Sequence, residues 1–176
     1  MIKPRINIDR LTSFTAIFVS LSTLIVFIYQ TNLIRKQQYT SVMPHLYVGL
    51  TGTYTPNFKI FMENTGIGPA IIESMTVKYK GKEYQMDLPS FLYEHAEGMD
   101  SLDNIYHSNV PVGTFIPVGR TINMIEVNNS QKDADALLEI LTQLDGAKFD
   151  FEIIYRSVYG ERWRIDNNTV YPEKLE

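Results

Sequence analysis

The chain has 176 residues, with 16 lysines and arginines against 20 aspartates and glutamates, and it contains no cysteine. This length suits one modest domain with an appendage rather than two full domains. Without cysteine there can be no disulfide framework, zinc ribbon or iron–sulfur cluster. A net charge of −4 gives no electrostatic reason to expect nucleic acid, so no nucleic-acid partner is predicted.

The first predicted element is a membrane-spanning helix. The 24 positions between Arg10 and Arg35 carry no charge and are rich in Leu, Ile, Val and Phe. A helix of that length spans about 36 Å, enough for a hydrocarbon core of about 30 Å. We therefore expect a short flank at 1–10 and a transmembrane helix that contacts the lipid bilayer through residues 11–34. A cleaved signal peptide is the alternative, but its apolar core should be shorter and end at a small-residue cleavage site.

The basic residues beside this helix predict its orientation. Lys3, Arg5 and Arg10 precede it, whereas Arg35 and Lys36 follow it. Because lysine and arginine favour the cytoplasmic side, the count of three against two predicts a cytoplasmic N-terminus. In a bacterium the chain would be a single-pass protein of the inner membrane with a periplasmic C-terminal domain.

The helix is expected to continue beyond the bilayer. No Gly or Pro occurs from Ile6 to Met43, and Pro44 is the first strong helix breaker. Since the residues after Ile34 are polar, segment 35–44 is predicted to be a juxtamembrane stalk.

One face of the helix carries small residues: Thr12, Ala16, Ser20 and Thr23. Such spacing allows two helices to approach closely, so the face predicts helix association, including a homo-oligomer. Alternatively, the hydroxyl groups bond to the carbonyls of their own helix.

Segment 45–172 is predicted to be an all-β domain, an antiparallel immunoglobulin-like sandwich of about seven or eight strands with one inserted short helix. Apolar residues alternate with polar ones in strands that begin near His45, Phe58, Ile71, Glu83, Thr121, Phe149 and Arg162. Phe58, Ile60 and Met62 should share one face, and so should Ile71, Met75, Val77 and Tyr79. The expected core contains Tyr47, Ile60, Met62, Val77, Ile125, Leu141, Ile153 and Trp163.

Two local patterns refine this expectation. The apolar stripe between Ser130 and Gly146 predicts a helix with Ser130 as its N-cap, which covers an open edge or end of the sandwich. The string Asn64–Ala70 predicts a tight turn with positive φ angles at Gly66 and Gly68, in which Asn64 bonds to backbone amides. We favour a structural turn over a recognition loop.

A likeness rests on the N-terminal anchor, the exit at 35–38, the junction at 41–44, the turn at 64–70 and the hairpin at 155–163. With these features the chain resembles uncharacterised bacterial single-pass membrane-anchored proteins with an immunoglobulin-like domain. The resemblance implies the anchor and the fold, and it brings no catalytic residue.

Two groups of residues are candidates for a partner surface. The first lies in the irregular stretch 87–110 and contains Glu94, His95, Glu97, Asp100, Asp103 and His107. Their spacing fits neither an EF-hand nor H-E-x-x-H, so a solvated acidic loop is favoured over a metal site. The second group is Arg156, Tyr159 and Arg162, because arginine and aromatic side chains often anchor interfaces. The alternative places Trp163 in the core and pairs the arginines with Glu152 or Asp166.

The chain shows no nucleophile elbow, phosphate-binding loop or zinc deaminase signature. We therefore expect no catalysis, cofactor or metal, and a sandwich that binds a protein or envelope partner within a membrane complex. The alternative from another class is a membrane-perturbing effector, for example of a bacterial defence system, that acts through helix association. An unrecognised hydrolase is the third possibility.

Overall fold

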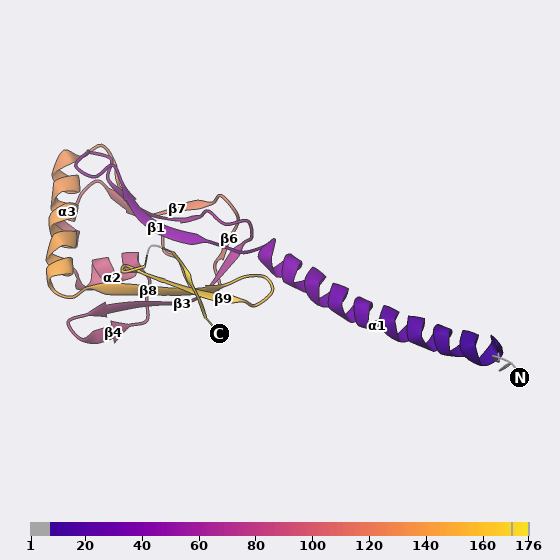
Figure 1. Ribbon diagram of the computed structural model, residues 1–176. Coiled ribbons are helices and arrows are strands. Elements are labelled where there is room, and N and C mark those ends of the chain that lie inside the picture. Colours follow the sequence, from indigo (N-terminus) through magenta and orange to yellow (C-terminus); the bar gives the residue numbers. More distant parts are fainter. Residues whose placement is uncertain (1–7, 170, 176) are drawn as a thin grey trace, which may run out of the picture. The chain divides into compact units, whose positions relative to one another are not determined.

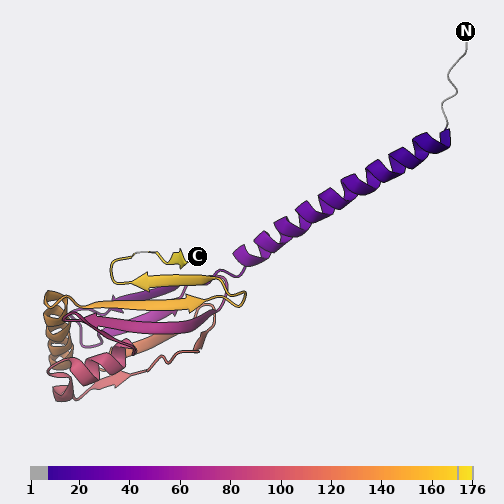
Figure 2. The same cartoon turned by 90° about the horizontal axis from the view of Figure 1, so that it is seen from below.

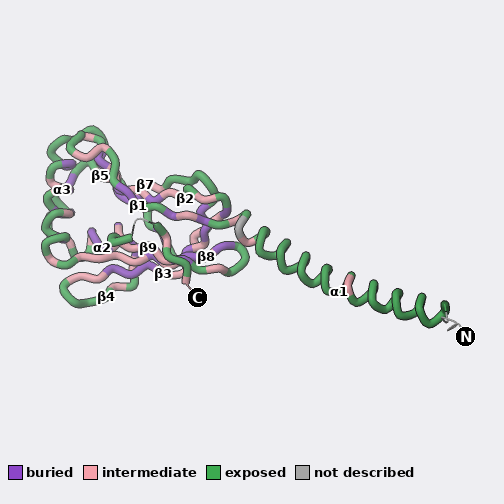
Figure 3. The backbone as a smooth tube through the Cα atoms, viewed as in Figure 1, coloured by how far each residue is buried: buried purple, intermediate pink, exposed green. Residues whose placement is uncertain are grey.

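The computed structural model describes residues 8–169 and 171–175, and the chain divides into two compact units after Ser41. The first unit contains one helix, α1 (Ile8–Thr40), which continues through the polar residues 35–38 because no Gly or Pro interrupts it. Residues Ile8–Tyr39 are long and apolar enough to cross a membrane. Figure 3 shows the helix exposed along nearly its whole length, while the predicted flank at 1–10 falls outside the described residues as far as Asn7.

The second unit consists mainly of strands. The described residues contain β1 (Leu46–Thr51), β2 (Lys59–Asn64), β3 (Ala70–Tyr79), β4 (Lys82–Tyr84), β5 (Ile105–His107), β6 (Phe115–Ile116), β7 (Thr121–Val127), β8 (Asp150–Arg156), β9 (Arg162–Asp166) and β10 (Glu173–Leu175). Two α-helices, α2 (Leu88–His95) and α3 (Gln131–Gly146), and the short 3₁₀ helix Met99–Ser101 complete the unit.

The strands form two antiparallel sheets, whose arrangement is seen from two sides in Figures 1 and 2. The first sheet has the order β1-β2-β7-β5, and the second has the order β10-β9-β8-β3-β4. Strand β6 also pairs with β3, at the end opposite to β4. Buried side chains of both sheets, such as Ile60 and Met62 from β2 and Ile153 and Tyr155 from β8, belong to one core.

Helix α3 begins and ends where the sequence predicts. The Ser130 hydroxyl accepts a hydrogen bond from the Asp133 N–H at 3.3 Å, which satisfies a free amide of the first turn. Leu137 and Leu144 are buried, but Leu141, expected in the core, is only partly buried because Ile140 takes the inner position. In Figure 1, α3 lies across one end of the sheets, the position expected of a covering helix.

Strand β3 corrects one predicted face. Ala70 and Ile72 are buried before Glu73, whereas Met75 and Val77 are buried after it. A β-bulge in the pairing with β8 falls between Ile72 and Ser74, so Glu73 is an extra residue that reverses the alternation. Ile71 therefore does not share a face with Met75 and Val77, as a regular strand would require.

The turn before β3 shows why its two glycines are needed. The positive φ angles expected at Gly66 and Gly68 are wrong, since neither glycine has one. Instead, a Cβ on Gly68 would lie 1.9 Å from the Val42 carbonyl oxygen, and one on Gly66 would lie 2.4 Å from the His45 nitrogen. The glycines therefore allow the turn to pack closely against the chain as it enters the domain.

Two further expectations are wrong. The stretch 87–110 is not irregular throughout, because α2 begins after Asp87, whose carboxylate accepts from the Ser90 N–H at 3.0 Å. Tyr47 is 45% exposed and lies outside the core, since residues 46 and 48 take the inner face of β1. Its ring covers Gly49 and meets Phe61 edge-on at 5.9 Å.

Candidate binding cleft beside strand β1

The domain contains an apolar cavity of about 550 Å³, within the range of ligand-binding pockets. Strand β1, the C-terminal end of α3, and β8 and β9 with the residues after β9 supply most of its walls. We call this cavity the β1 cleft. Its lining consists of Leu46, Tyr47, Val48, Gly49, Leu50, Ile60, Leu88, Leu141, Leu144, Asp145, Phe149, Phe151, Ile165, Asp166, Asn167 and Thr169.

The cleft follows the free edge of β1. Five consecutive residues of this strand, Leu46 to Leu50, line the cleft. Because successive side chains point to opposite faces of a sheet, lining by all five residues indicates a space that reaches the edge of the strand rather than one face alone. Since β1 pairs only with β2 in the described residues, its other edge is available.

The backbone groups at this edge follow from the pairing register. The Thr65 N–H donates to the His45 carbonyl at 2.8 Å, so this carbonyl points toward the chain of β2. Alternation along β1 then directs the N–H and C=O groups of Val48 and Leu50 away from β2. Two donors and two acceptors therefore point from the free edge.

The exposure of the inner side chains shows where the cleft opens. Leu46, Val48 and Leu50 lie on the same face of β1. Leu46 is 1% exposed, Val48 is partly buried, and Leu50 is 52% exposed. The cleft is thus closed at the beginning of β1 and open at its end.

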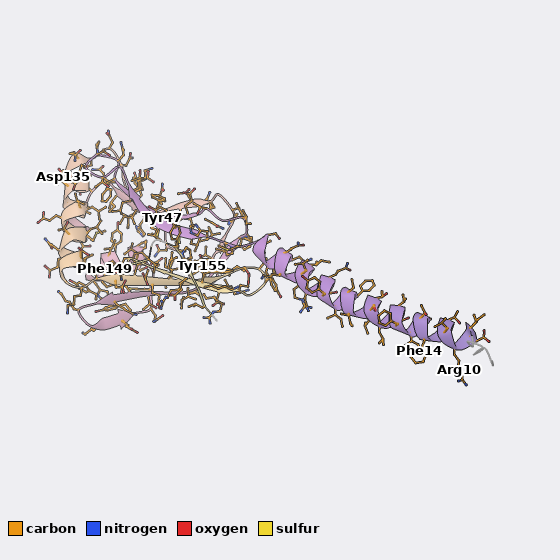
Figure 4. All side chains as sticks on the ribbon, in the orientation of Figure 1. Arg10, Phe14, Tyr47, Asp135, Phe149 and Tyr155 are labelled. Carbon is orange, nitrogen blue, oxygen red and sulfur yellow. The ribbon has the colours of Figure 1, made fainter. Side chains whose placement is uncertain are left out.

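Tyr155 contributes to the closed end. Its ring is fully buried, and its hydroxyl accepts a hydrogen bond from the Leu46 N–H at 3.3 Å. Burial raises the pKa of the Tyr155 phenol from its ordinary value of 10 to about 12. In Figure 4, Tyr47 lies on one sheet, Tyr155 lies on the other sheet, and Phe149 lies just before that second sheet begins.

The opposite wall is held in place by Asn167. Its amide oxygen accepts from the Phe151 N–H at 2.8 Å, and its amide nitrogen donates to the Phe149 carbonyl at 3.2 Å. These two bonds fix the start of β8, where Phe149 and Phe151 supply apolar surface to the cleft.

The rim of the cleft is acidic. Asp145 is exposed in the last turn of α3, where no basic residue balances the negative end of the helix dipole. Asp166 stands at the end of β9, and its carboxylate accepts from the Asn168 N–H at 2.9 Å. Both residues line the cleft, so its mouth favours a cationic group.

The acidic and histidine candidates of the stretch 87–110 do not line the β1 cleft. Glu94 and His95 end α2, Asp100 belongs to the 3₁₀ helix, and His107 ends β5; these four, with Glu97 and Asp103, are exposed. His95 packs against Tyr84 at 4.4 Å between ring centroids, and His107 against Tyr93 at 4.6 Å. In the described residues, no three His, Asp or Glu side chains are grouped to hold a metal ion.

Two of the arginine candidates are engaged within the domain. The Glu73 carboxylate lies 3.4 Å from Arg156 Nε and 2.6 Å from Arg162 Nε. Glu73 is the bulge residue, and it takes the place of Glu152 or Asp166 as the partner of these two arginines. The third arginine of the hairpin, Arg164, does pair with Glu152, at 3.6 Å between Nη1 and Oε2. Tyr159 is 51% exposed at the tip of the β8–β9 hairpin, while Trp163 is buried, as the alternative interpretation requires.

The small-residue face of α1 keeps both of its interpretations. Thr12 and Thr23 donate to carbonyls of their own helix at 2.8–3.0 Å, as the second interpretation states. Ser20 has no hydrogen-bond partner among the described residues. Ala16 lies between these positions and is exposed.

No protein-family profile matches the chain, and no curated protein is significantly similar to it in sequence. The sequence does not indicate the β1 cleft, since Tyr47 is expected inside the core and the segment after His45 is expected to be an ordinary strand.

Proposed function

We propose that the chain is a non-enzymatic, single-pass membrane protein whose immunoglobulin-like sandwich binds a protein partner within a membrane complex. Residues 11–34 form the anchor, in the inner membrane of a bacterium, with the N-terminus in the cytoplasm and the domain in the periplasm. The proposal is supported by the apolar helix and by the β1 cleft. The β1 cleft is the main support for the binding of a partner.

The cleft is suited to an extended segment of the partner. Strand addition needs free backbone donors and acceptors at a sheet edge, with a space beside them for alternate side chains. Val48 and Leu50 supply the free backbone donors and acceptors, and the β1 cleft supplies the space for side chains. The partner segment should therefore alternate apolar residues and carry Lys or Arg near Asp145 and Asp166.

One substitution separates strand addition from other binding. Proline at position 50 removes an N–H that points away from β2, so the pairing of β1 with β2 remains. Linear peptides would be selected on the reconstituted full chain and then measured against Leu50→Pro and Leu50→Ala by fluorescence anisotropy. We expect alternating apolar peptides that bind the wild type and Leu50→Ala but not Leu50→Pro.

Thr51→Pro is the matched control for folding. Position 51 belongs to a hydrogen-bonded pair with Lys59, so this variant loses an internal bond as well. Leu50→Pro should retain the far-ultraviolet spectrum of the wild type and Thr51→Pro should unfold more readily. Peptide binding that is equal in the wild type and Leu50→Pro contradicts the strand-addition mechanism.

The alternative is an effector that perturbs the membrane through association of α1. The small side chains at Ala16 and Ser20 favour it, since they allow two helices to approach closely. Overexpression should then depolarise cells, and Ser20→Leu should abolish the effect. A partner-binding protein should be harmless in both forms.

A further inference from the structure

Three loops at one end of the domain lie side by side. They are the turn 65–69 before β3, the segment 111–120 around β6, and the turn 157–160 between β8 and β9. Phe115 pairs with Ile71, and Ile71 pairs with Arg156, which places the three loops together. We call them the end loops.

The end loops expose large apolar side chains. Those at least 46% exposed are Ile67, Val112, Phe115, Val118, Val158 and Tyr159. Single exposed apolar residues are common on protein surfaces, but six in three adjoining loops are typical of an interaction surface.

Charge sets this end apart from the rest of the domain. Residues 41–176 contain 19 carboxylates against 11 lysines and arginines, yet the end loops and residues 41–45 contain no Asp or Glu. Arg120 is their one formal charge. The acidic residues of α2 and α3 lie beyond the opposite ends of β3 and β7. An anionic surface would therefore repel most of the domain but not this end.

The chain from α1 enters the domain at the same end. The N–H groups of Ile67 and Gly68 donate to the Met43 carbonyl at 3.0 and 3.3 Å. Ile34, the last apolar residue of the anchor, precedes Val42 by eight positions, a helical length of about 12 Å. The headgroup layer on one side of a bilayer is about 5–8 Å thick. The connection exceeds this layer by only about 4–7 Å, which keeps Val42 and the turn that it contacts close to the lipid surface.

We propose that the end loops are seated in the headgroup layer of the membrane that holds α1, with lipid as their partner. This inference rests on the anchor of the proposed function, but it does not depend on the β1 cleft. Aromatic and apolar side chains at this depth stabilise the orientation of a domain on the bilayer, as interfacial residues of membrane proteins do.

The absence of cysteine allows single labels. The full chain would carry Val118→Cys, Val158→Cys or the exposed control Lys132→Cys on α3, each with a polarity-sensitive fluorophore. The chains would be diluted in liposomes containing anionic lipid and headgroup nitroxides, with no other protein. Labels at 118 and 158 should show emission at shorter wavelength and nitroxide quenching, while the label at 132 should show neither.

Two results would overturn the inference. One is the emission of a water-exposed label, without quenching, at all three positions. The other is an emission at shorter wavelength, at positions 118 and 158, that disappears on dilution or occurs without nitroxide quenching. In that case a second chain, rather than lipid, would cover the end loops. Ile25→Cys, quenched by acyl-chain nitroxides, reports the anchor separately. A quenched label at 25 with unquenched labels at 118 and 158 refutes this inference alone.

A charged substitution in the end loops should remove them from the headgroup layer. In the chain labelled at 118, Val158→Asp places a carboxylate in the end loops, and quenching by headgroup nitroxides should be lost. Lys132→Asp adds negative charge at the other end of the domain and should leave the quenching unchanged. Equal quenching in both variants contradicts the inference.

Discussion

Tyr155 and Leu46 join the two sheets although 109 residues separate them: the buried phenol accepts the backbone N–H at the start of β1. This N–H lies at the free edge of β1, where no strand of residues 8–169 or 171–175 supplies a carbonyl. The Tyr155 side chain thus takes the place of a neighbouring strand at one point of the β1 edge, and the remainder of this edge stays open.

The Tyr155 phenol should make the domain sensitive to alkali. Its pKa is about 12 in the folded state, above the ordinary value of 10. The contribution of its proton to stability is fully present below pH 10 and is lost as the pH rises through 12. A shift of two units corresponds to about 3 kcal/mol in the free energy of unfolding.

Tyr155→Phe should lower the stability by about 1–3 kcal/mol near pH 8, because the Leu46 N–H loses its acceptor. Between pH 10 and 12 the wild type should lose more stability than the variant, so the difference between them should shrink. Urea unfolding of the full chain in detergent, followed by fluorescence at pH 8 and at pH 12, measures the difference in stability between the wild type and the variant. A constant difference would show that the phenol does not titrate in this range.

Asn64 should be the most sensitive polar residue of the domain. Its buried amide accepts from the His45 and Gly66 N–H groups and donates to the Gly68 and Ile116 carbonyls. Asn64→Ala should cost about 3 kcal/mol, because several buried groups lose their partners. Asn168→Ala, at an exposed position, is the matched control and should be neutral in the same urea titration.

Trp163 should report on the packing of the second sheet. It is 3% exposed, and its ring stacks on Tyr155 with centroids 6.0 Å apart. Trp163→Ala should cost about 3–5 kcal/mol through the cavity that it leaves. Trp163→Phe should cost less, and calorimetry of both variants measures the difference. Equal, small losses would place the ring outside the core.

The domain should fold without its anchor. A fragment that begins at Ser41 keeps Val42 and Met43, which contact the turn at 66–68. It should be soluble, unfold cooperatively and give a mainly β circular-dichroism spectrum. A fragment that begins at Leu46 should be less stable, because the N–H groups of Ile67 and Gly68 lose the Met43 carbonyl. Aggregation of the longer fragment would show dependence on the membrane segment or on a partner.

The elements with strong local signals could be predicted from the sequence. The cap at Ser130 and the apolar stripe after it define α3, and Lys80 and Gly81 adopt the positive φ angles of a two-residue hairpin turn. The face formed by Phe58, Ile60 and Met62 is buried as predicted, since it depends only on period-two alternation.

The remainder depends on contacts between distant segments. The bulge at Glu73 and the close approach of Gly68 to Val42 arise from pairing partners that no local pattern identifies. Helix α2 is short and contains Pro89, so its eight residues resemble a loop. The β1 cleft is an edge property, and the order of strands in a sheet cannot be deduced from their individual patterns.

The bulge at Glu73 also limits how the length of β3 can change. The first half of the strand pairs with β6 and the second with β4, and each half has its own inward parity. Deleting residue 73 would remove the bulge and leave residues 70, 72, 75 and 77 in regular alternation, so both halves would stay inward. Inserting one residue would instead shift the register of one half against β8 by two residues. A chain that lacks the bulge residue should therefore keep the same core and lose only the carboxylate that pairs with Arg156 and Arg162, so homologous chains should tolerate a one-residue deletion here but not a one-residue insertion.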